Sequence, residues 1–103
     1  MIKHIVMWRL KDHAEGADKA TNAARIIALL QSLNGRIEGL RHLEVGRNFA
    51  DSEFAADLVL YSELDSREAL AHYQQHPEHQ AVAKLVSAMV SDRRVVDYEL
   101  GDD

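Results

Sequence analysis

Residues 73–80, YQQHPEHQ, hold a tyrosine, two histidines and the only proline of the chain. Proline is tolerated in the first turn of a helix but not in its interior. Pro77 therefore predicts the start of a new helix and a break from the helix before it. Beyond the break, Val82 and Val86 have the spacing of one helix face, and His79 lies three residues before Val82 on that face.

Two helices are predicted around this break. Asp65-Ser66 followed by Glu68 is typical of a helix start, where a side-chain oxygen accepts a backbone N–H and a carboxylate reaches back. The pattern predicts a short helix over 67–75 and a second helix over 77–90.

Four other segments alternate apolar and polar residues with the period of a strand. In the first of them His4, Val6 and Trp8 share one face, while Ile5 and Met7 lie on the other. Apolar groups on both faces indicate a strand that is covered on both sides. The predicted elements in order are strand 2–11, helix 17–33, strands 40–48 and 54–62, helices 67–75 and 77–90, and strand 95–100 before a polar tail, 101–103.

This order, βαββαβ with the last helix broken in two, is that of the ferredoxin-like α+β fold. In that fold a four-stranded antiparallel sheet carries its helices on one face. The other face stays open in a monomer, and we expect it to carry Ile5, Met7, Val59, Tyr61 and Val95. Because such an apolar face indicates a partner surface, we expect a homodimer through the open sheet face.

Composition narrows the class of protein. The chain of 103 residues suits a single domain, 1–103, and without cysteine it has no disulfide framework. Its 12 Lys and Arg against 17 Asp and Glu give a net charge of −5, which argues against a nucleic-acid partner. The one adjacent basic pair, Arg93-Arg94, is interpreted as the polar entry to the last strand. No apolar run is long enough for a bilayer and no signal-peptide pattern is present, so we expect no membrane partner and a cytoplasmic location.

Three side chains are candidates for catalysis: His4, Tyr73 and His79. His4 lies on the strand face that packs under the helices, where Tyr73 and His79 arrive from the other side, so the three are expected to line one cavity. A tyrosine–histidine pair passes a proton when one residue lowers the pKa of the other. Alternatively, each side chain bonds its own backbone partner and is structural. The predicted substrate pocket comprises Val6, Trp8, Ile27, Leu60 and Val82.

A metal site is the weaker interpretation of the same histidines. His72, His76 and His79 have ligand-like spacing, and His4 offers a fourth nitrogen. However, Pro77 separates two of them, and no inward carboxylate is expected to support a metal-bound histidine. The sequence also contains no phosphate-loop or dinucleotide-binding motif. We therefore expect neither a metal nor a cofactor.

Several segments together resemble the stress-responsive A/B barrel domain (Dabb) family. They are IKHIV at 2–6, LEVGRN at 43–48, ADLVL at 56–60, YQQHPEH at 73–79 and VDYEL at 96–100. The resemblance covers nearly the whole chain and implies a dimeric α+β barrel, in which two four-stranded sheets face each other. Most members of this family are small stress-associated or uncharacterised proteins.

Plant polyketide cyclases are similar to this family, and they close a linear polyketide by aldol chemistry without a cofactor. The histidine in their first strand matches His4, and the tyrosine in their helix matches Tyr73. The second histidine of their His-Pro-x-His motif matches His79. The resemblance therefore implies that these residues carry acid–base chemistry on a carbonyl substrate. The first helix departs from the cyclases, with Ala23, Ala24 and Ile27 in the place of bulky aromatic pocket residues.

Two functions remain open. One is a cofactor-independent cyclase or isomerase, with Tyr73 as the base, His79 orienting it or polarising a carbonyl oxygen, and His4 assisting. The other is a non-catalytic stress-associated or small-ligand-binding homodimer. A cavity of at least about 300 Å³ at Tyr73 and His79 favours an enzyme or a binder, whereas a solid core favours a structural protein. Haem-dependent oxidation, found in other dimeric α+β barrels, is the weakest alternative.

Overall fold

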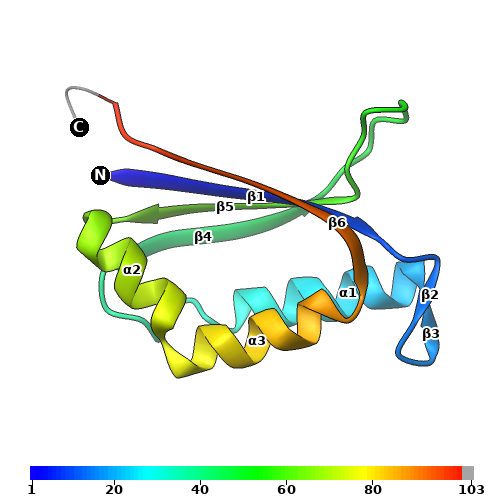
Figure 1. Ribbon diagram of the computed structural model, residues 1–103, viewed down its shortest axis with the longest axis horizontal. Helices are drawn as coiled ribbons and strands as arrows, with labels where there is room; N and C mark the ends of the chain where they lie inside the picture. The colour runs from blue at the N-terminus through cyan, green and yellow to red at the C-terminus, as the bar shows by residue number, and fades with distance from the viewer. Residues whose placement is uncertain (101–103) are drawn as a thin grey trace.

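The computed structural model describes residues 1–100, which form a sheet with helices packed on one face (Figure 1). The predicted polar tail, 101–103, lies outside the described residues. Within the described part of the chain no helix is long and apolar enough to span a bilayer. The elements in order are β1 (Ile2–Leu10), β2 (His13–Ala14), β3 (Ala17–Asp18), α1 (Lys19–Gln31), β4 (Leu40–Arg47), β5 (Leu58–Leu64), α2 (Arg67–Gln75), α3 (Pro77–Ser87) and β6 (Val90–Tyr98).

The main sheet has the strand order β4-β5-β1-β6, and every neighbouring pair is antiparallel. The first strand, β1, is therefore internal, between β5 and the edge strand β6. Figure 1 shows α1, α2 and α3 on the same side of this sheet, with α2 and α3 meeting at an angle. The predicted ferredoxin-like α+β fold, with helices on one face, is confirmed.

Alternation along the strands builds the core between the sheet and the helices. The even-numbered residues of β1, from Ile2 to Leu10, are all buried, and the odd-numbered ones between them are more exposed. Leu58 and Leu64 of β5 and Ile26 of α1 are at most 1% exposed and complete this layer. Fully burying an apolar side chain of this size contributes about 1.5–3 kcal/mol. The face of β1 that the sequence predicts as the core is the one buried.

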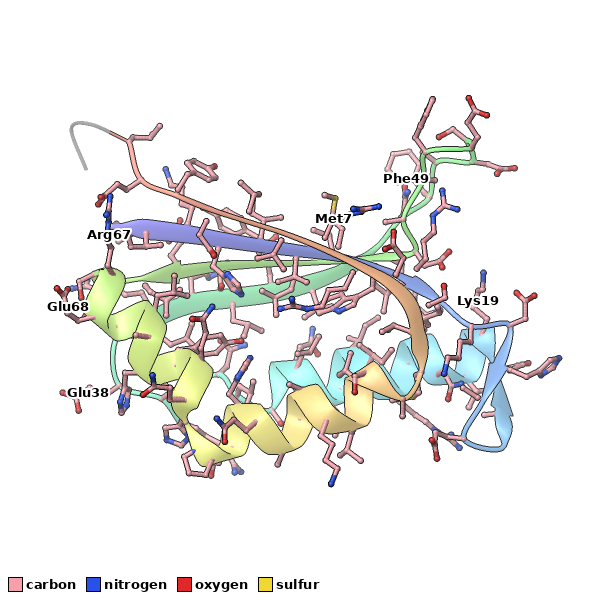
Figure 2. The ribbon with its side chains drawn as sticks, viewed as in Figure 1. Met7, Lys19, Glu38, Phe49, Arg67 and Glu68 are labelled. Carbon is pink, nitrogen blue, oxygen red and sulfur yellow. The ribbon has the colours of Figure 1, made fainter. Side chains whose placement is uncertain are left out.

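The sheet face opposite the helices is open and partly apolar. Ile5 opposes Tyr61 and Met7 opposes Val59 in the register, so these four residues share that face, as predicted. Met7 and Val59 are 40% and 37% exposed, and Figure 2 shows Met7 pointing away from the helices. Figure 2 also shows Phe49, which is fully exposed, on the loop that projects to this side.

Val95 does not belong to the open face, contrary to the prediction. It opposes Val6 of β1, and residues directly opposite in an antiparallel pair point to the same side of the sheet. Val96 opposes Ile5 and therefore takes its place on the open face. The prediction is one residue off because positions 95 and 96 are both valine, so the sequence does not distinguish them. A shift of one residue moves a side chain to the other face of a sheet.

The predicted limits of two strands are corrected. β5 begins later than predicted, at Leu58, because the Ala55 N–H bonds the Ser52 carbonyl in a turn just before it. β6 begins earlier, at Val90, and includes the segment 91–94 that the sequence suggests is a connection. That segment has no apolar alternation, so only its backbone pairing with β1 identifies it as a strand.

The first helix also begins later than predicted, at Lys19. The Asp18 carboxylate accepts the backbone N–H of Thr21 at 2.9 Å and caps the helix. The residues before it form the hairpin of β2 and β3, which turns at Gly16 with a positive φ of 74°.

Candidate active site

The helix break lies where Pro77 predicts it. α2 ends at Gln75, and His76 stands between the helices with an extended backbone, ψ 132°, as expected for a residue before proline. Its Nδ1 accepts the backbone N–H of Glu78 at 3.1 Å, which caps the first turn of α3. α3 ends at Ser87, earlier than the predicted end.

The break brings Tyr73 and His79 together. Their ring centroids are 4.3 Å apart and their planes are tilted by 47°. On one unbroken helix these two residues would point to different sides, since a turn takes 3.6 residues. The change of direction at the proline is therefore what allows the last turn of α2 and the first turn of α3 to present their rings to each other.

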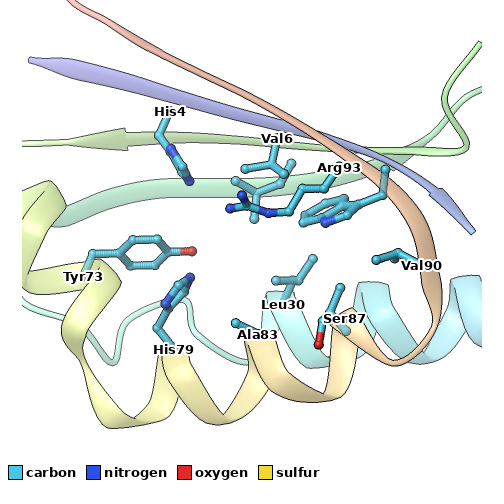
Figure 3. A pocket seen from close by; sticks show the side chains of 12 residues that line it. His4, Val6, Leu30, Tyr73, His79, Ala83, Ser87, Val90 and Arg93 are labelled. Atoms are coloured by element: carbon cyan, nitrogen blue, oxygen red, sulfur yellow. The ribbon is translucent and has the colours of Figure 1, made fainter. Parts of the chain in front are cut away.

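Both rings line a cavity of about 220 Å³ between the sheet and the helices. Figure 3 shows Tyr73 entering it from α2, His79 from α3 and His4 from the sheet, so the three predicted candidates meet at one cavity. The volume is below the roughly 300 Å³ at which small-molecule sites usually begin, so the cavity suits a compact ligand. The lining residues are His4, Val6, Trp8, Leu30, Leu60, Tyr73, His79, Ala83, Val86, Ser87, Val90 and Arg93.

Three of the predicted pocket residues line this cavity: Val6, Trp8 and Leu60. The other two do not. Val82 is buried in the core, and α3 lines the cavity through His79, Ala83, Val86 and Ser87. Ile27 is half-buried on α1, one turn before Leu30, and Leu30 occupies the lining position in its place.

Tyr73 is buried, with 1% of its surface exposed. Burial raises the pKa of its phenol to about 12, although the positive charge of Arg93 acts in the opposite direction. The hydroxyl therefore keeps its proton at neutral pH and is a hydrogen-bond donor. The hydroxyl makes no hydrogen bond within residues 1–100. Since no fully buried polar side-chain atom in this part of the chain lacks a partner, the hydroxyl oxygen is not fully buried and faces the space of the cavity.

His79 is half-buried, and one of its ring nitrogens is already engaged. Its Nδ1 lies 3.2 Å from the carbonyl oxygen of Gln74. A carbonyl only accepts hydrogen bonds, so Nδ1 carries the proton and Nε2 presents a lone pair. Burial lowers the pKa of the ring, and the nearby His4 and Arg93 lower it further. His79 is therefore neutral at pH 7 and able to accept a proton.

His4 is held by a carboxylate that the sequence does not predict. It is 2% exposed, and its Nδ1 contacts Oδ1 of Asp97, the residue opposite it in the pairing of β1 and β6. A carboxylate accepts, so Nδ1 of His4 carries the proton and Nε2 remains available for other contacts. The His4 ring stands edge-on to Tyr73, with centroids 5.9 Å apart. The expectation of no inward carboxylate beside a histidine is therefore wrong.

Arg93 lines the cavity, and the sequence does not reveal this. The pair Arg93-Arg94 has the polarity of a strand entry, but the register separates the two residues. Arg93 opposes Trp8 and faces the helices, whereas Arg94 opposes Met7 and faces the open side. Figure 3 shows the Arg93 side chain extending from β6 into the cavity. Alternation along the strand indicates that the two arginines point to opposite faces. Which of them points inward depends on the register of β6 with β1.

The other histidines of this region form no metal site. The rings of His72 and His76 are 5.7 Å apart, but Nδ1 of His76 accepts the helix cap of α3. Within residues 1–100 no group of three or more His, Cys, Asp or Glu side chains is arranged to hold a metal ion.

The cavity thus combines a neutral imidazole that accepts a proton with a phenol that donates one. Titratable neighbours whose environments suit them to opposite proton transfers are typical of acid–base sites. The directions of the two pKa shifts favour His79 as a proton acceptor and Tyr73 as a proton donor. The sequence suggests the opposite roles, with Tyr73 as the base.

Known proteins are similar to this chain in sequence and in fold. The family described as Dabb, Stress responsive A/B Barrel Domain, matches residues 2–100. An uncharacterised protein of Streptomyces coelicolor is 38% identical over 85 residues, which are 82% of this chain and 86% of that protein. A stress-response A/B barrel domain-containing protein of Arabidopsis thaliana is 29% identical over 102 residues, which are 95% of this chain but 36% of that protein.

A similar solved structure comes from Bacteroides fragilis and is described as a dimeric protein of unknown function with a ferredoxin-like fold. It superposes with a TM-score of 0.82 at 31% identity, and the match covers 96% of this chain and 95% of that one.

Proposed function

The chain belongs to the stress-responsive A/B barrel domain family. We propose that it is a cofactor-independent cyclase or isomerase of a small carbonyl compound. The observation that carries the proposal is the contact between Tyr73 and His79 at one cavity. The pKa of the phenol is raised and that of the imidazole is lowered, so donor and acceptor are both in their useful protonation states at neutral pH.

In the proposed reaction His79 is the base. Its Nε2 takes a proton from the carbon next to the substrate carbonyl, and the electron pair of that C–H bond forms an enolate. Tyr73 donates a hydrogen bond to the enolate oxygen, where negative charge develops. In an isomerisation the substrate also carries a C=C bond next to the deprotonated carbon, so the enolate is a dienolate, and the imidazolium returns the proton to its far carbon as the double bond shifts. In a cyclisation the enolate carbon bonds a second carbonyl carbon of the same molecule, and the resulting alkoxide takes the proton.

His4 has a supporting role in this proposal. Asp97 holds its Nδ1, so the ring is oriented and its Nε2 offers a further hydrogen-bonding group near Tyr73. The electron count of the substrate does not change in either reaction, so the proposed chemistry needs no redox cofactor.

Deuterium exchange tests the proposal without knowledge of the natural substrate. The probe is 2,6-heptanedione in D₂O, with NMR detection of exchange next to the carbonyls and of ring closure. We expect the protein to accelerate exchange and His79→Ala to lower that acceleration by about 10²–10⁴-fold, the usual contribution of a positioned base. Tyr73→Phe should also lower it. His72→Ala, which changes an exposed histidine of α2 outside the cavity, is the matched control.

Two results would overturn the proposal. One is an exchange rate no faster than that of imidazole buffer. The other is an equal loss of exchange in His72→Ala and His79→Ala, because His79 lines the cavity and His72 does not.

We further propose that two copies associate through the open sheet face and that this dimer acts in the cytoplasm. The similar Bacteroides fragilis protein is described as dimeric. In this chain Met7, Val59 and Val96 remain 37–47% exposed on that face, which a second copy would cover. The cavity lies on the other side of the sheet, so a small ligand still reaches it in such a dimer.

A further inference from the structure

The cavity contains one permanent charge, and it is positive. Arg93 is the only lysine, arginine or carboxylate residue among its lining residues. The two histidines that line it have their Nδ1 atoms engaged by Asp97 and by the carbonyl of Gln74. A ligand entering the cavity therefore meets apolar walls, hydrogen-bonding side chains and a guanidinium.

The guanidinium of Arg93 is not used by the fold. Within residues 1–100 it has no hydrogen bond and no ion pair, whereas the adjacent Arg94 pairs with Asp92 at 3.4 Å. Arg93 is exposed and also lines the cavity, which places it where the cavity reaches solvent. An arginine in this position keeps its hydration when the cavity is empty and can exchange it for a bound anion.

Arg93 also lies within electrostatic range of the acid–base pair. Its charge lowers the pKa of the Tyr73 phenol and that of the His79 ring. Figure 3 shows its side chain on the sheet side of the cavity, with Tyr73 and His79 on the helix side. One molecule can therefore span from the guanidinium to these two residues.

We propose that Arg93 is an anion anchor and that the compound bound in this cavity is a small oxo acid, with its carboxylate on Arg93 and its ketone at Tyr73 and His79. The ketone end of this inference rests on the proposed function, whereas the carboxylate end does not. The planar guanidinium matches a carboxylate with two parallel hydrogen bonds, an arrangement that is stronger and more directional than bonds between neutral groups. The overall net charge of −5 makes a local cation all the more necessary for an anionic ligand.

The test compares two ligands of nearly equal size, 5-oxohexanoate and 2,6-heptanedione, in which a carboxylate replaces an acetyl group. Binding is measured by calorimetry and by the fluorescence of Trp8, the only tryptophan of the chain and a lining residue. We expect the protein to bind the oxo acid about 10–100-fold more tightly, the range for a hydrogen bond to a charged group. Arg93→Gln should remove this preference and Arg93→Lys should keep part of it. Arg94→Gln, on the opposite face of the same strand, should leave it intact.

Failure of the anion anchor and failure of the proposed catalysis give different experimental results. A carboxylate preference that persists in Arg93→Gln, or that is missing from the unaltered protein at millimolar ligand, overturns the anchor. A slower exchange of the neutral diketone in Arg93→Gln, with both affinities unchanged, also overturns it, because Arg93 would then act on the enolate. If the preference is present but Tyr73→Phe and His79→Ala exchange at the unaltered rate, the anchor stands and the proposed catalysis fails.

Discussion

The rings of Tyr73 and His79 lie 4.3 Å apart although Pro77 ends the helix of one and starts the helix of the other. The contact depends on the break, because only a change of direction lets these two residues face each other. The same contact places a buried phenol beside an imidazole whose pKa is lowered. We therefore expect the protonation state of His79 to change with pH below its ordinary pKa.

The stability of the protein should decrease as the pH falls below 6.5. The pKa of His79 is lower in the folded chain than its ordinary value of 6.5, chiefly because of burial. Between the two values the unfolded chain binds more protons, so protonation favours unfolding. Urea denaturation on both sides of pH 6.5 measures the effect, and His79→Gln should make the free energy of unfolding less dependent on pH. An unchanged pH profile in that variant would contradict the lowered pKa.

The side chain of Asp97 should determine the tautomer of His4. Asp97→Ala removes the acceptor of the buried Nδ1–H and should cost about 1–3 kcal/mol of stability. The ring ¹⁵N shifts of His4 report the tautomer, and we expect a protonated Nδ1 in the unaltered protein and a mixed population in the variant. Asp92→Ala removes an exposed carboxylate of the same strand and is the control. Identical His4 spectra in all three proteins would refute this role.

Two glycines allow backbone strain to be separated from a steric clash. Gly35 and Gly39 both have positive φ, 76° and 87°. A Cβ at Gly39 would lie 2.7 Å from Cβ of Ala69, whereas a Cβ at Gly35 meets nothing within 4 Å. Gly35→Ala should cost about 1–2 kcal/mol for the left-handed backbone alone. Gly39→Ala should cost a further 1–3 kcal/mol or so for overpacking. Denaturant titration of both variants checks this, and equal losses would show that Ala69 yields without cost.

A charge on the open sheet face should weaken the proposed dimer. Val59→Lys places an ammonium opposite Met7, where burial in a dry interface would cost several kcal/mol. We expect the variant to sediment as a monomer at concentrations where the unaltered protein is dimeric. Ala71→Lys, at an exposed position of α2, is the control for added charge. A Val59→Lys protein with unchanged sedimentation would place the interface elsewhere.

The helix break and the buried face of β1 are both predictable from local sequence patterns. Proline cannot continue a helix, so Pro77 located the break without any tertiary information. The alternation of His4, Val6 and Trp8 with more exposed residues identified the inner face, because side chains of a strand alternate with a period of two. The convergence of His4, Tyr73 and His79 on one cavity follows from these two features.

The side chains of β6 that complete the site are not predictable from local sequence patterns. Polar and apolar residues occur on both of its faces, so its alternation does not distinguish inside from outside. The backbone register with β1 settles the question, since it sets Arg93 opposite Trp8 and Asp97 opposite His4. A shift of one residue would have turned Arg94 and Val96 inward instead. The cation of the cavity and the carboxylate behind His4 are thus products of strand pairing between the two ends of the chain, which no local pattern specifies.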